Sequence, residues 1–250
     1  MNFVVLFKLS MLQESFQQII DFRRSNRVFD PNIIVPEEVI TRSLERAILS
    51  PNSSNMQLWE FYWINSEASK KAFVPLCLGQ SAAKTAQEMV VFVTRKDLWR
   101  KRAKWNLDRI QETVEGEPNR LQKGGLQYYG KVMPLLYMND GIGIMPTIRR
   151  LISFFGGLRK PFFRTGGAAN QRIMAHKSCA LAAQTFMLSI AAEGFHSCPM
   201  EGFDAHRVRK ALGLPWGAEI NMIISVGKGT EEGIWGPRFR VPYNEVVFKK

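Results

Sequence analysis

The chain has 250 residues, 46% of them hydrophobic, and it carries 34 Lys and Arg against 22 Asp and Glu, a formal net charge of +12. A chain of this length and apolar content can bury a full core without disulfides, so we expect one domain spanning residues 1–250. The three cysteines form no CxxC pair and the three histidines no HExxH pattern. This pattern argues against a disulfide framework and a metal site, and it favours the cytoplasm.

Residues 1–8 are apolar over only a few positions and lack the basic start and small-residue cleavage site of a signal peptide. We expect a short extension ahead of Met11. No apolar run approaches the roughly 20 residues that a bilayer-spanning helix needs. We therefore expect a soluble, cytoplasmic protein.

The next stretch predicts an amphipathic helix with apolar residues at Phe16, Ile19, Ile20 and Phe22. Directly after it comes a basic cluster, Arg23-Arg24-Ser25-Asn26-Arg27. The planar donors of arginine match phosphate oxygens and a serine hydroxyl can add a bond, so the cluster suits a compact phosphate. A solvated basic turn explains the same residues, and from this stretch alone both interpretations stay open.

The chain then predicts a helix, a polar loop and two strands. The helix opens at Pro36 and ends before Pro51, and its buried stripe is Ile40, Leu44, Ala47 and Ile48. Residues 51–59 are rich in short polar side chains and poor in residues that could pack a core, which predicts a binding loop or an ordinary capped turn. A strand at 60–64, a helix from about Ser66 and a central strand at 88–94 follow.

Residues 99–165 hold 13 Lys or Arg and 5 Asp or Glu, so much of the positive charge is concentrated there. We expect a charged helix at 101–114, a loop at 116–125 and a further helix or lid segment at 128–137. Residues 141–165 combine apolar groups with five basic residues and no acid. Such a segment can lie on a membrane. We favour a mobile lid or a helix packed on the protein, because apolar stripes at helical spacing usually face protein.

Residues 170–193 predict a long helix that is apolar on nearly every face and closed by Gly194. Burial of such a helix can call for a second subunit. Residues 197–204 predict a turn, from which Asp204 caps a helix that runs to Gly213. A second central strand at 219–226, a basic loop at 235–242 and a terminal strand at 245–248 complete one α+β domain.

Several of these stretches, taken in order, match one known pattern. They are RRSNR followed by FD, the helix opening PEE, PNSSNMQLW, the long buried helix, CPMEGFD and RFRVP. In this order the chain resembles the FMN-dependent nitroreductase family over about residues 12–98 and 170–246, whereas 99–165 is a variable part. The resemblance implies an α+β fold with a central, mostly antiparallel sheet flanked by helices and a long buried helix at a homodimer interface. It also implies FMN as cofactor and NAD(P)H as a transient hydride donor.

The resemblance also assigns residues to a flavin site. Arg23 and Ser25 match positions that hold the phosphate, Arg24 belongs to the same motif, and Arg27 matches a position that reaches toward the pyrimidine edge. A loop contributed by the partner subunit matches Pro51, Asn52, Ser53 and Asn55. This chain departs from the commonest form of that loop, PSSxNxQPW, at Asn52 and Leu58.

The remaining matches come from three later stretches. Gln80 and Lys84 match residues that bond the pyrimidine ring. The turn on which the flavin rests matches Pro199, Met200, Glu201 and Gly202, with backbone N–H groups of the last two near flavin N5. Arg238 and Arg240 match a late basic pair that closes around the phosphate.

The activity implied is ping-pong transfer of hydride from NAD(P)H through flavin N5 to an electron-poor small molecule such as a nitroaromatic or a quinone, with no catalytic side chain required. One alternative keeps FMN and the fold but performs reductive dehalogenation or flavin destruction. The other makes residues 99–165 a surface for a membrane or nucleic acid. We expect no nucleic-acid partner and rank membrane association below an enzymatic role.

Overall fold

Four antiparallel strands form the central sheet, in the order β1-β2-β4-β3. The computed structural model describes residues 3–140, 142–164 and 167–250, with side chains from Met11 onward. The strands are β1 (Trp59–Ile64), β2 (Glu88–Thr94), β3 (His196–Met200) and β4 (Glu219–Gly227). Three of them confirm the predicted strands. β3 is a correction, because it occupies the first half of a stretch predicted as a turn.

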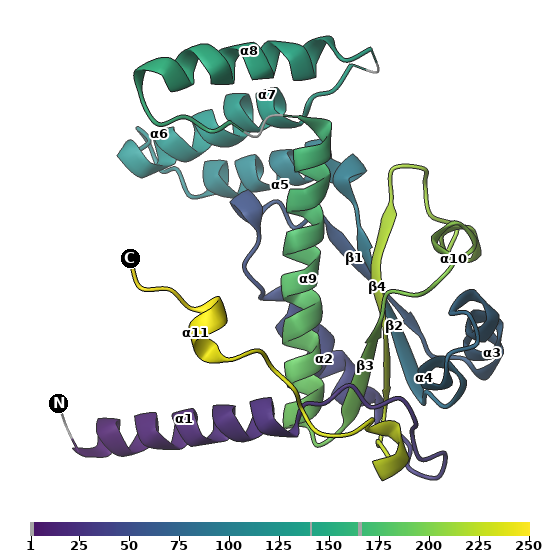
Figure 1. Ribbon diagram of the computed structural model, residues 1–250. Helices are drawn as coiled ribbons and strands as arrows, with labels where there is room; N and C mark the ends of the chain where they lie inside the picture. Colours follow the sequence, from purple (N-terminus) through teal and green to yellow (C-terminus); the bar gives the residue numbers. More distant parts are fainter. Residues whose placement is uncertain (1–2, 141, 165–166) are drawn as a thin grey trace.

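Both faces of the sheet are covered, which explains the unbroken apolar run of β2. Val90 and Phe92 face a core shared with α2 (Glu37–Ile48) and α9 (Ala168–Ala192). Met89 and Val91 face a second core, which is closed by α3 (Glu67–Leu76), α4 (Ser81–Lys84) and α10 (Ala205–Ala211). Figure 1 shows the long helix α9 running along one side of the sheet and the short helices on the other.

Residues 99–164 form a helical layer at one end of the molecule, drawn uppermost in Figure 1. It consists of α5 (Trp99–Glu112), α6 (Arg120–Gln127), a π-helical turn η3 (Tyr128–Val132), α7 (Met133–Tyr137) and α8 (Ile144–Arg159). The predicted loop at 116–125 was wrong, because Asn119 and Gln122 form a reciprocal capping box that starts α6. Gly141 and Thr165, the ends of the apolar and basic segment, lie outside the described residues.

This layer shares a third core with the polar loop after α2. Met56 and Leu58 are buried there together with Met133 and Tyr137. The expectation that residues 51–59 pack no core was therefore wrong for their second half. The first half of the loop holds a short 3-10 turn, η1 (Ser53–Asn55).

The two ends of the chain extend from the body on the same side (Figure 1). Helix α1 (Phe3–Phe22) includes residues 3–10, which were expected to be an extension. At the other end, η4 (Glu231–Gly233) is followed by a basic loop and a single-turn helix α11 (Tyr243–Val246), where a strand was predicted wrongly. A further short turn, η2 (Lys96–Leu98), precedes α5.

Some predicted core positions are on the surface of this one chain. Ile173 and Leu181 of α9 are each 47% exposed, and Ile48 of α2 is 51% exposed. Phe16 of α1 is 56% exposed. None of the helices in the described ranges is long and apolar enough to cross a bilayer.

Candidate functional site

Four guanidinium groups gather where α1 ends, although they come from the two ends of the sequence. Burial, followed by repulsion from Arg238, Arg240 and Arg24, lowers the pKa of Arg23. Among the described residues, no carboxylate forms an ion pair with Arg23, Arg24 or Arg240. The structure therefore places like charges together in a half-buried site, an arrangement that favours a bound anion.

Arg238 has a structural task within this cluster. Its Nη2 lies within hydrogen-bond distance of three carbonyl oxygens at the end of α1, those of Ile20, Asp21 and Arg23, at 3.1, 3.0 and 2.8 Å. A cation at a helix C-terminus satisfies carbonyl groups that have no partner within the helix and complements the helix dipole. Arg240 is exposed, and its side chain donates to the carbonyl oxygen of its neighbour Phe239.

The segment after Arg23 is held by a buried asparagine. Asn26 is fully buried, its Nδ2 donates to Thr230 O over 2.7 Å, and its Oδ1 accepts from Val28 N over 3.1 Å. A Cβ at Gly233 would come within 1.8 Å of Asn26 Oδ1, and one at Gly229 within 2.2 Å of Asn26 Nδ2. These glycines let the C-terminal segment approach Asn26 closely, so Asn26 positions the backbone of the basic cluster.

The other members of the first motif lie beside this segment. Ser25 forms a bridge to Ser197 of β3, and Arg24 Nη2 donates to Gly236 O over 2.8 Å. The guanidinium carbon of Arg27 lies 4.1 Å from the centroid of the Trp235 ring. Stacking on an aromatic face holds a planar guanidinium in one orientation. Trp235 was expected only as part of a basic loop.

The end of β3 brings two further predicted stretches together. Gln80 Nε2 donates to Gly202 O over 2.6 Å and to Cys77 O over 3.1 Å. Pro199 and Met200 end the strand, and Glu201 and Gly202 are exposed just beyond it. In the described part of the chain, no hydrogen bond from the backbone N–H of Glu201 or Gly202 is found. Both N–H groups are thus available to a ligand.

Lys84 is exposed at the end of α4, and its Nζ lies 4.0 Å from the position that a Cβ of Gly79 would take. Gly79 directly precedes Gln80 in the sequence. Gln80, Lys84 and the turn at Gly202 therefore belong to one neighbourhood.

Hydrogen bonds join the loop at residues 51–55 to the helical layer. Asn55 Nδ2 donates to Asn106 Oδ1, and Asn106 Nδ2 donates to Asn55 O, both over 2.9 Å. Ser54 contacts Tyr128 OH at 2.7 Å, and Tyr129 OH donates to Ser54 O over 2.9 Å.

The backbone of this loop has an unusual conformation and is also anchored to α9. Ser54, Asn55 and Gln57 have positive φ angles of 54°, 47° and 47°. Three such residues within four positions amount to a strained conformation of the kind that clusters at functional sites. Ser53 N donates to Ser178 Oγ over 3.2 Å, and Asn52 Oδ1 accepts from Gln57 N over 2.8 Å.

Within one chain this loop lies far from the basic cluster. Ser53 is anchored to Ser178 of α9. The Phe22 ring instead packs, tilted by 43°, against His196, which follows the end of that helix, at a centroid distance of 4.6 Å. The 14 residues of α9 between Ser178 and its end at Ala192 span roughly 21 Å at 1.5 Å per residue. The structure therefore joins the predicted residues into two separate groups.

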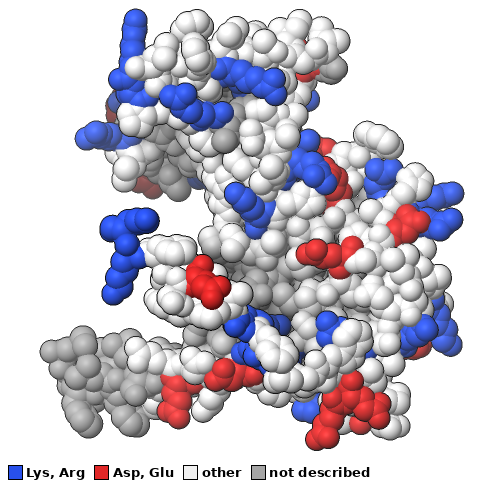
Figure 2. Space-filling view, viewed as in Figure 1, with Lys and Arg blue, Asp and Glu red and all other residues white. Residues whose placement is uncertain are grey.

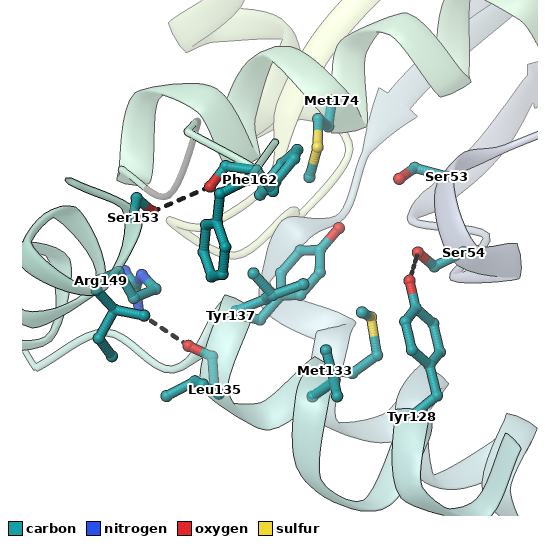
Figure 3. A pocket seen from close by; sticks show the side chains of 14 residues that line it. Ser53, Ser54, Tyr128, Met133, Leu135, Tyr137, Arg149, Ser153, Phe162 and Met174 are labelled. Atoms are coloured by element: carbon teal, nitrogen blue, oxygen red, sulfur yellow. Dashed lines mark hydrogen bonds between the residues drawn. The ribbon is translucent and has the colours of Figure 1, made fainter. Parts of the chain in front are cut away.

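A cavity of about 440 Å³ opens beside the loop at Ser53 and Ser54. Figure 3 shows Tyr137, Met133 and Met174 around its middle, with Ser53 and Ser54 on one side and Phe162 and Ser153 on the other. Apart from a few polar groups its lining is apolar and aromatic. Burial raises the pKa of Tyr137 to about 12, so this phenol is neutral at physiological pH.

Several residues of these two groups were not predicted from the sequence. Asn106, Tyr128 and Tyr129 hold the loop across more than 50 positions of sequence, and nothing in their local pattern marks them. Asn26 differs from these residues, because an amide within a run of cations could have been recognised from the sequence as a position with a structural role.

Comparison with known proteins identifies the family of this chain. The chain is 30% identical over 228 residues to the NADH dehydrogenase of Thermus thermophilus, covering 90% of this chain and 91% of that protein. Among solved structures, a protein from Exiguobacterium sibiricum in complex with FMN superposes with a TM-score of 0.64 at 23% identity, over 94% of this chain and 97% of that one. CLA-ER, an enone reductase of gut-bacterial fatty acid saturation, superposes with a TM-score of 0.69 at 17% identity, over 93% and 97% of the two chains. Residues 20–228 match the Nitroreductase family, and the chain is a member of that family.

Proposed function

We propose that this protein is an FMN-dependent oxidoreductase that takes hydride from NAD(P)H and delivers two electrons to an apolar, electron-poor acceptor. The observation that carries the proposal is the gathering of Arg23, Arg24, Arg238 and Arg240, whose one ion pair among the described residues is that of Arg238 with Asp21 at 3.8 Å. A flavin mononucleotide supplies both the phosphate that such a cluster favours and, when bound, the two-electron redox chemistry.

The first group fits the phosphate end of FMN. Arg23 and Ser25 would bond the phosphate, and the exposed side chain of Arg240 would close over it. Arg238 would contribute charge at a distance, since its Nη2 already bonds the end of α1. Placing the phosphate among these cations replaces their mutual repulsion with attraction.

The same neighbourhood fits the ring end. The free backbone N–H groups of Glu201 and Gly202 would donate to ring heteroatoms. Gln80 and Lys84, at the two ends of α4, would approach the ring from that helix. Arg27, oriented by Trp235, would place a fixed positive charge near the ring. A cation there stabilises negative charge that develops on reduction, which favours transfer of electron pairs.

We propose a homodimer in which the loop at residues 51–55 completes the site of the second copy. The roughly 21 Å between this loop's anchor and the end of α9 prevents one chain from supplying both groups to one ring. The exposed apolar residues of α1 and α9, such as Phe16, Ile173 and Leu181, provide a surface that a second copy would bury.

The cavity beside the loop indicates the acceptor's character. It abuts Ser53 and Ser54, and its lining is mostly aliphatic, thioether and aromatic. Quinones and nitroaromatics fit such a lining, and so does an α,β-unsaturated carbonyl compound, the acceptor class indicated by the name of the enone reductase relative.

The proposal is tested with the purified protein. Its absorbance spectrum should show bound flavin or gain it on addition of FMN, and the flavin band should bleach on anaerobic addition of NADH or NADPH. Reoxidation by a benzoquinone, a nitroaromatic and an enone then ranks the acceptors. A protein that neither retains nor binds FMN contradicts the proposal.

The dimer is tested separately with Leu181→Asp. We expect this variant to sediment as a monomer and to lose FMN, whereas Leu121→Asp, at an 86% exposed position of α6, should remain dimeric and keep the flavin. A monomeric wild type that holds FMN would show that one chain is sufficient.

The alternatives with the same cofactor are separated by product. Reductive dehalogenation would release halide from an iodinated or brominated phenol, and flavin destruction would bleach FMN irreversibly under air. Reversible bleaching followed by reoxidation with a quinone supports the proposed reaction.

A further inference from the structure

Helix α8 turns its polar and small residues inward. Arg149 and Ser153, one turn apart, are the residues of α8 that are buried. Arg149 donates to Met138 O and to Asn139 Oδ1, over 2.6 and 2.7 Å, and Ser153 Oγ donates to Phe163 O over 3.0 Å. The inner face of the helix is therefore fixed by hydrogen bonds.

The segment after α8 folds back against it and fixes its orientation. A Cβ at Gly156 would lie 2.7 Å from the Phe162 ring, and one at Gly157 would lie 2.5 Å from Arg164 Nη2, so both glycines allow a close approach. Arg164 Nη2 donates to Gly157 O over 2.8 Å. The outer face of α8 is thus a defined surface.

That outer face is apolar. With 3.6 residues per turn, Leu151, Phe155 and Leu158 lie opposite the buried pair, and they are 52%, 62% and 66% exposed. Further exposed apolar side chains widen the face, namely Ile144, Ile148, Ile152 and Phe154. A soluble helix normally shows the reverse arrangement, with its apolar stripe toward the core.

Cations flank the apolar face on both sides. Arg150 and Arg159 project from opposite flanks of α8, roughly 100° from the centre of the apolar face. Residues 141–165 contain five basic residues and no acid. The preceding carboxylate, Asp140, accepts from the backbone N–H groups of Gly143 and Met145, both over 3.0 Å. Figure 2 shows blue side chains set among uncharged atoms at this end of the molecule.

We propose that the outer face of α8 is a docking surface for an anionic lipid bilayer. A helix lying in the plane of an interface has an apolar face that enters the acyl boundary and flanking Arg or Lys side chains that reach the headgroups. A juxtaposed cation adds attraction to anionic lipid. The same chemistry excludes nucleic acid as the main partner, because the centre of the surface is apolar.

A second copy of the chain fits this face poorly. Two such faces would bring Arg150 and Arg159 of both copies together, and the chain as a whole carries +12. The exposed apolar side of α1 lies at the other end of the molecule from α8 (Figure 1). Ile152 and Phe162 also line the cavity, so docking would set the cavity beside the bilayer.

Co-sedimentation with vesicles tests the proposal. We expect the full chain to sediment with equimolar phosphatidylcholine and phosphatidylglycerol vesicles but not with phosphatidylcholine alone. The double variant Leu151→Asp with Phe155→Asp should lose binding, and the control Ile34→Asp, at a 77% exposed position before α2, should retain it. Arg150→Glu should weaken partitioning by about fivefold per charge removed, whereas Lys71→Glu on α3 should have a smaller effect.

A label measures insertion directly and does not depend on loss of binding. The native cysteines are buried, so Phe155→Cys can be labelled selectively with an environment-sensitive dye. Its emission should shift to the blue on anionic vesicles and be quenched by lipids brominated in the acyl chain, whereas a label at Ile34→Cys should do neither.

Three results would overturn the proposal. One is absence of sedimentation with anionic vesicles. Another is binding lost through charge reversal but unaffected by the apolar substitutions, which would assign the face to a polyanion such as nucleic acid. The third is a change of oligomeric state in the Leu151→Asp with Phe155→Asp variant and no blue shift of the label, which would make the face an interface between copies.

Discussion

Nη2 of Arg238 donates to the carbonyl oxygen of Arg23 over 2.8 Å, a bond that joins residues 215 positions apart. Because the same nitrogen also reaches carbonyl oxygens of Ile20 and Asp21, the basic cluster and the end of α1 form one unit. Substitutions of Arg238 and of Arg23 should therefore have different effects. Loss of Arg238 should mainly affect stability, and loss of Arg23 should mainly affect anion binding.

Arg238→Ala is expected to lower the free energy of unfolding by about 1 kcal/mol, because it removes a charged donor from carbonyl groups at a helix end. Urea unfolding measures the loss, and amide hydrogen exchange should increase in α1. Arg240→Ala, which removes an exposed side chain, should leave the midpoint unchanged. Equal midpoints for both variants would rule out the capping role.

Arg23→Ala should weaken FMN binding by about 10- to 100-fold, because the phosphate loses a charged donor. Without a bound anion, Arg23 is repelled by the neighbouring arginines, as its lowered pKa indicates. Removing its charge relieves that repulsion, so the free energy of unfolding of the flavin-free protein should not fall. Thermal unfolding with and without inorganic phosphate checks this without flavin.

The matched control is Arg207→Ala on α10, which should respond to phosphate and FMN as the wild type does. If Arg23→Ala retained a full phosphate-dependent shift, the anion would have to bind elsewhere.

Asn106→Ala should lower the free energy of unfolding by about 1 to 3 kcal/mol. Asn106 is 5% exposed, and its loss leaves Asn55 Nδ2 without its partner and leaves Asn55 O with the 3.3 Å bond from Gln57 Nε2 alone. We also expect the loop at residues 51–55 to lose its fixed conformation and FMN retention to fall. Calorimetry and flavin release measure the two effects. Asn119→Ala at the start of α6 serves as control, since it removes an exposed cap remote from the loop.

Stability should depend on pH through Glu193. A hydrogen bond from Arg42, supported by Arg46, holds the pKa of Glu193 below its ordinary value of 4.5. The folded protein therefore keeps this carboxylate charged at pH values where the unfolded chain protonates it. Its contribution is complete above about pH 4.5 and is lost as the pH falls through the lowered pKa.

Unfolding free energies of wild type and Glu193→Gln should accordingly differ most at neutral pH and converge in acid. Glu115→Gln, which alters an exposed carboxylate at the end of the helical layer, should follow the wild type at every pH. A constant difference between wild type and Glu193→Gln down to pH 3 would mean that ionisation of Glu193 does not supply the stability.

The central strands were predictable because their chemistry is local. β2 is a nearly continuous run of branched and apolar residues, and β4 is rich in them apart from Asn221 and Ser225. Such strands occur where both faces of a sheet are covered. β3 was missed because Pro199 and short polar residues dominate it. It is an edge strand whose pairing with β4 alone identifies it. The capping box that starts α6 was visible at Asn119 and Gln122, but two glycines in the helix suggested a loop.

The sequence could name candidate residues for the site, but it could not give their arrangement in space. The resemblance named Arg23, Gln80 and Gly202 from separate stretches, and the contact of Gln80 with Gly202 O brings two of them together. It could not reveal that Arg238 bonds the end of α1, because that depends on where the tail lies in space. The three positive φ angles in the loop were equally hidden, since Ser54 and Asn55 are held by partners distant in the sequence, and Gln57 by Asn52 of the same loop.

The bond between Arg238 and Arg23 also sets an order of events during synthesis. Arg23 leaves the peptidyl-transferase centre 215 residues before its partner does, a delay of roughly 10 to 40 s at about 5 to 20 residues per second. Throughout that interval the carbonyl groups at the end of α1 have no cap and the anion site lacks two of its cations. A nascent chain therefore cannot cap α1 or complete the basic cluster until Arg238 and Arg240 have been added.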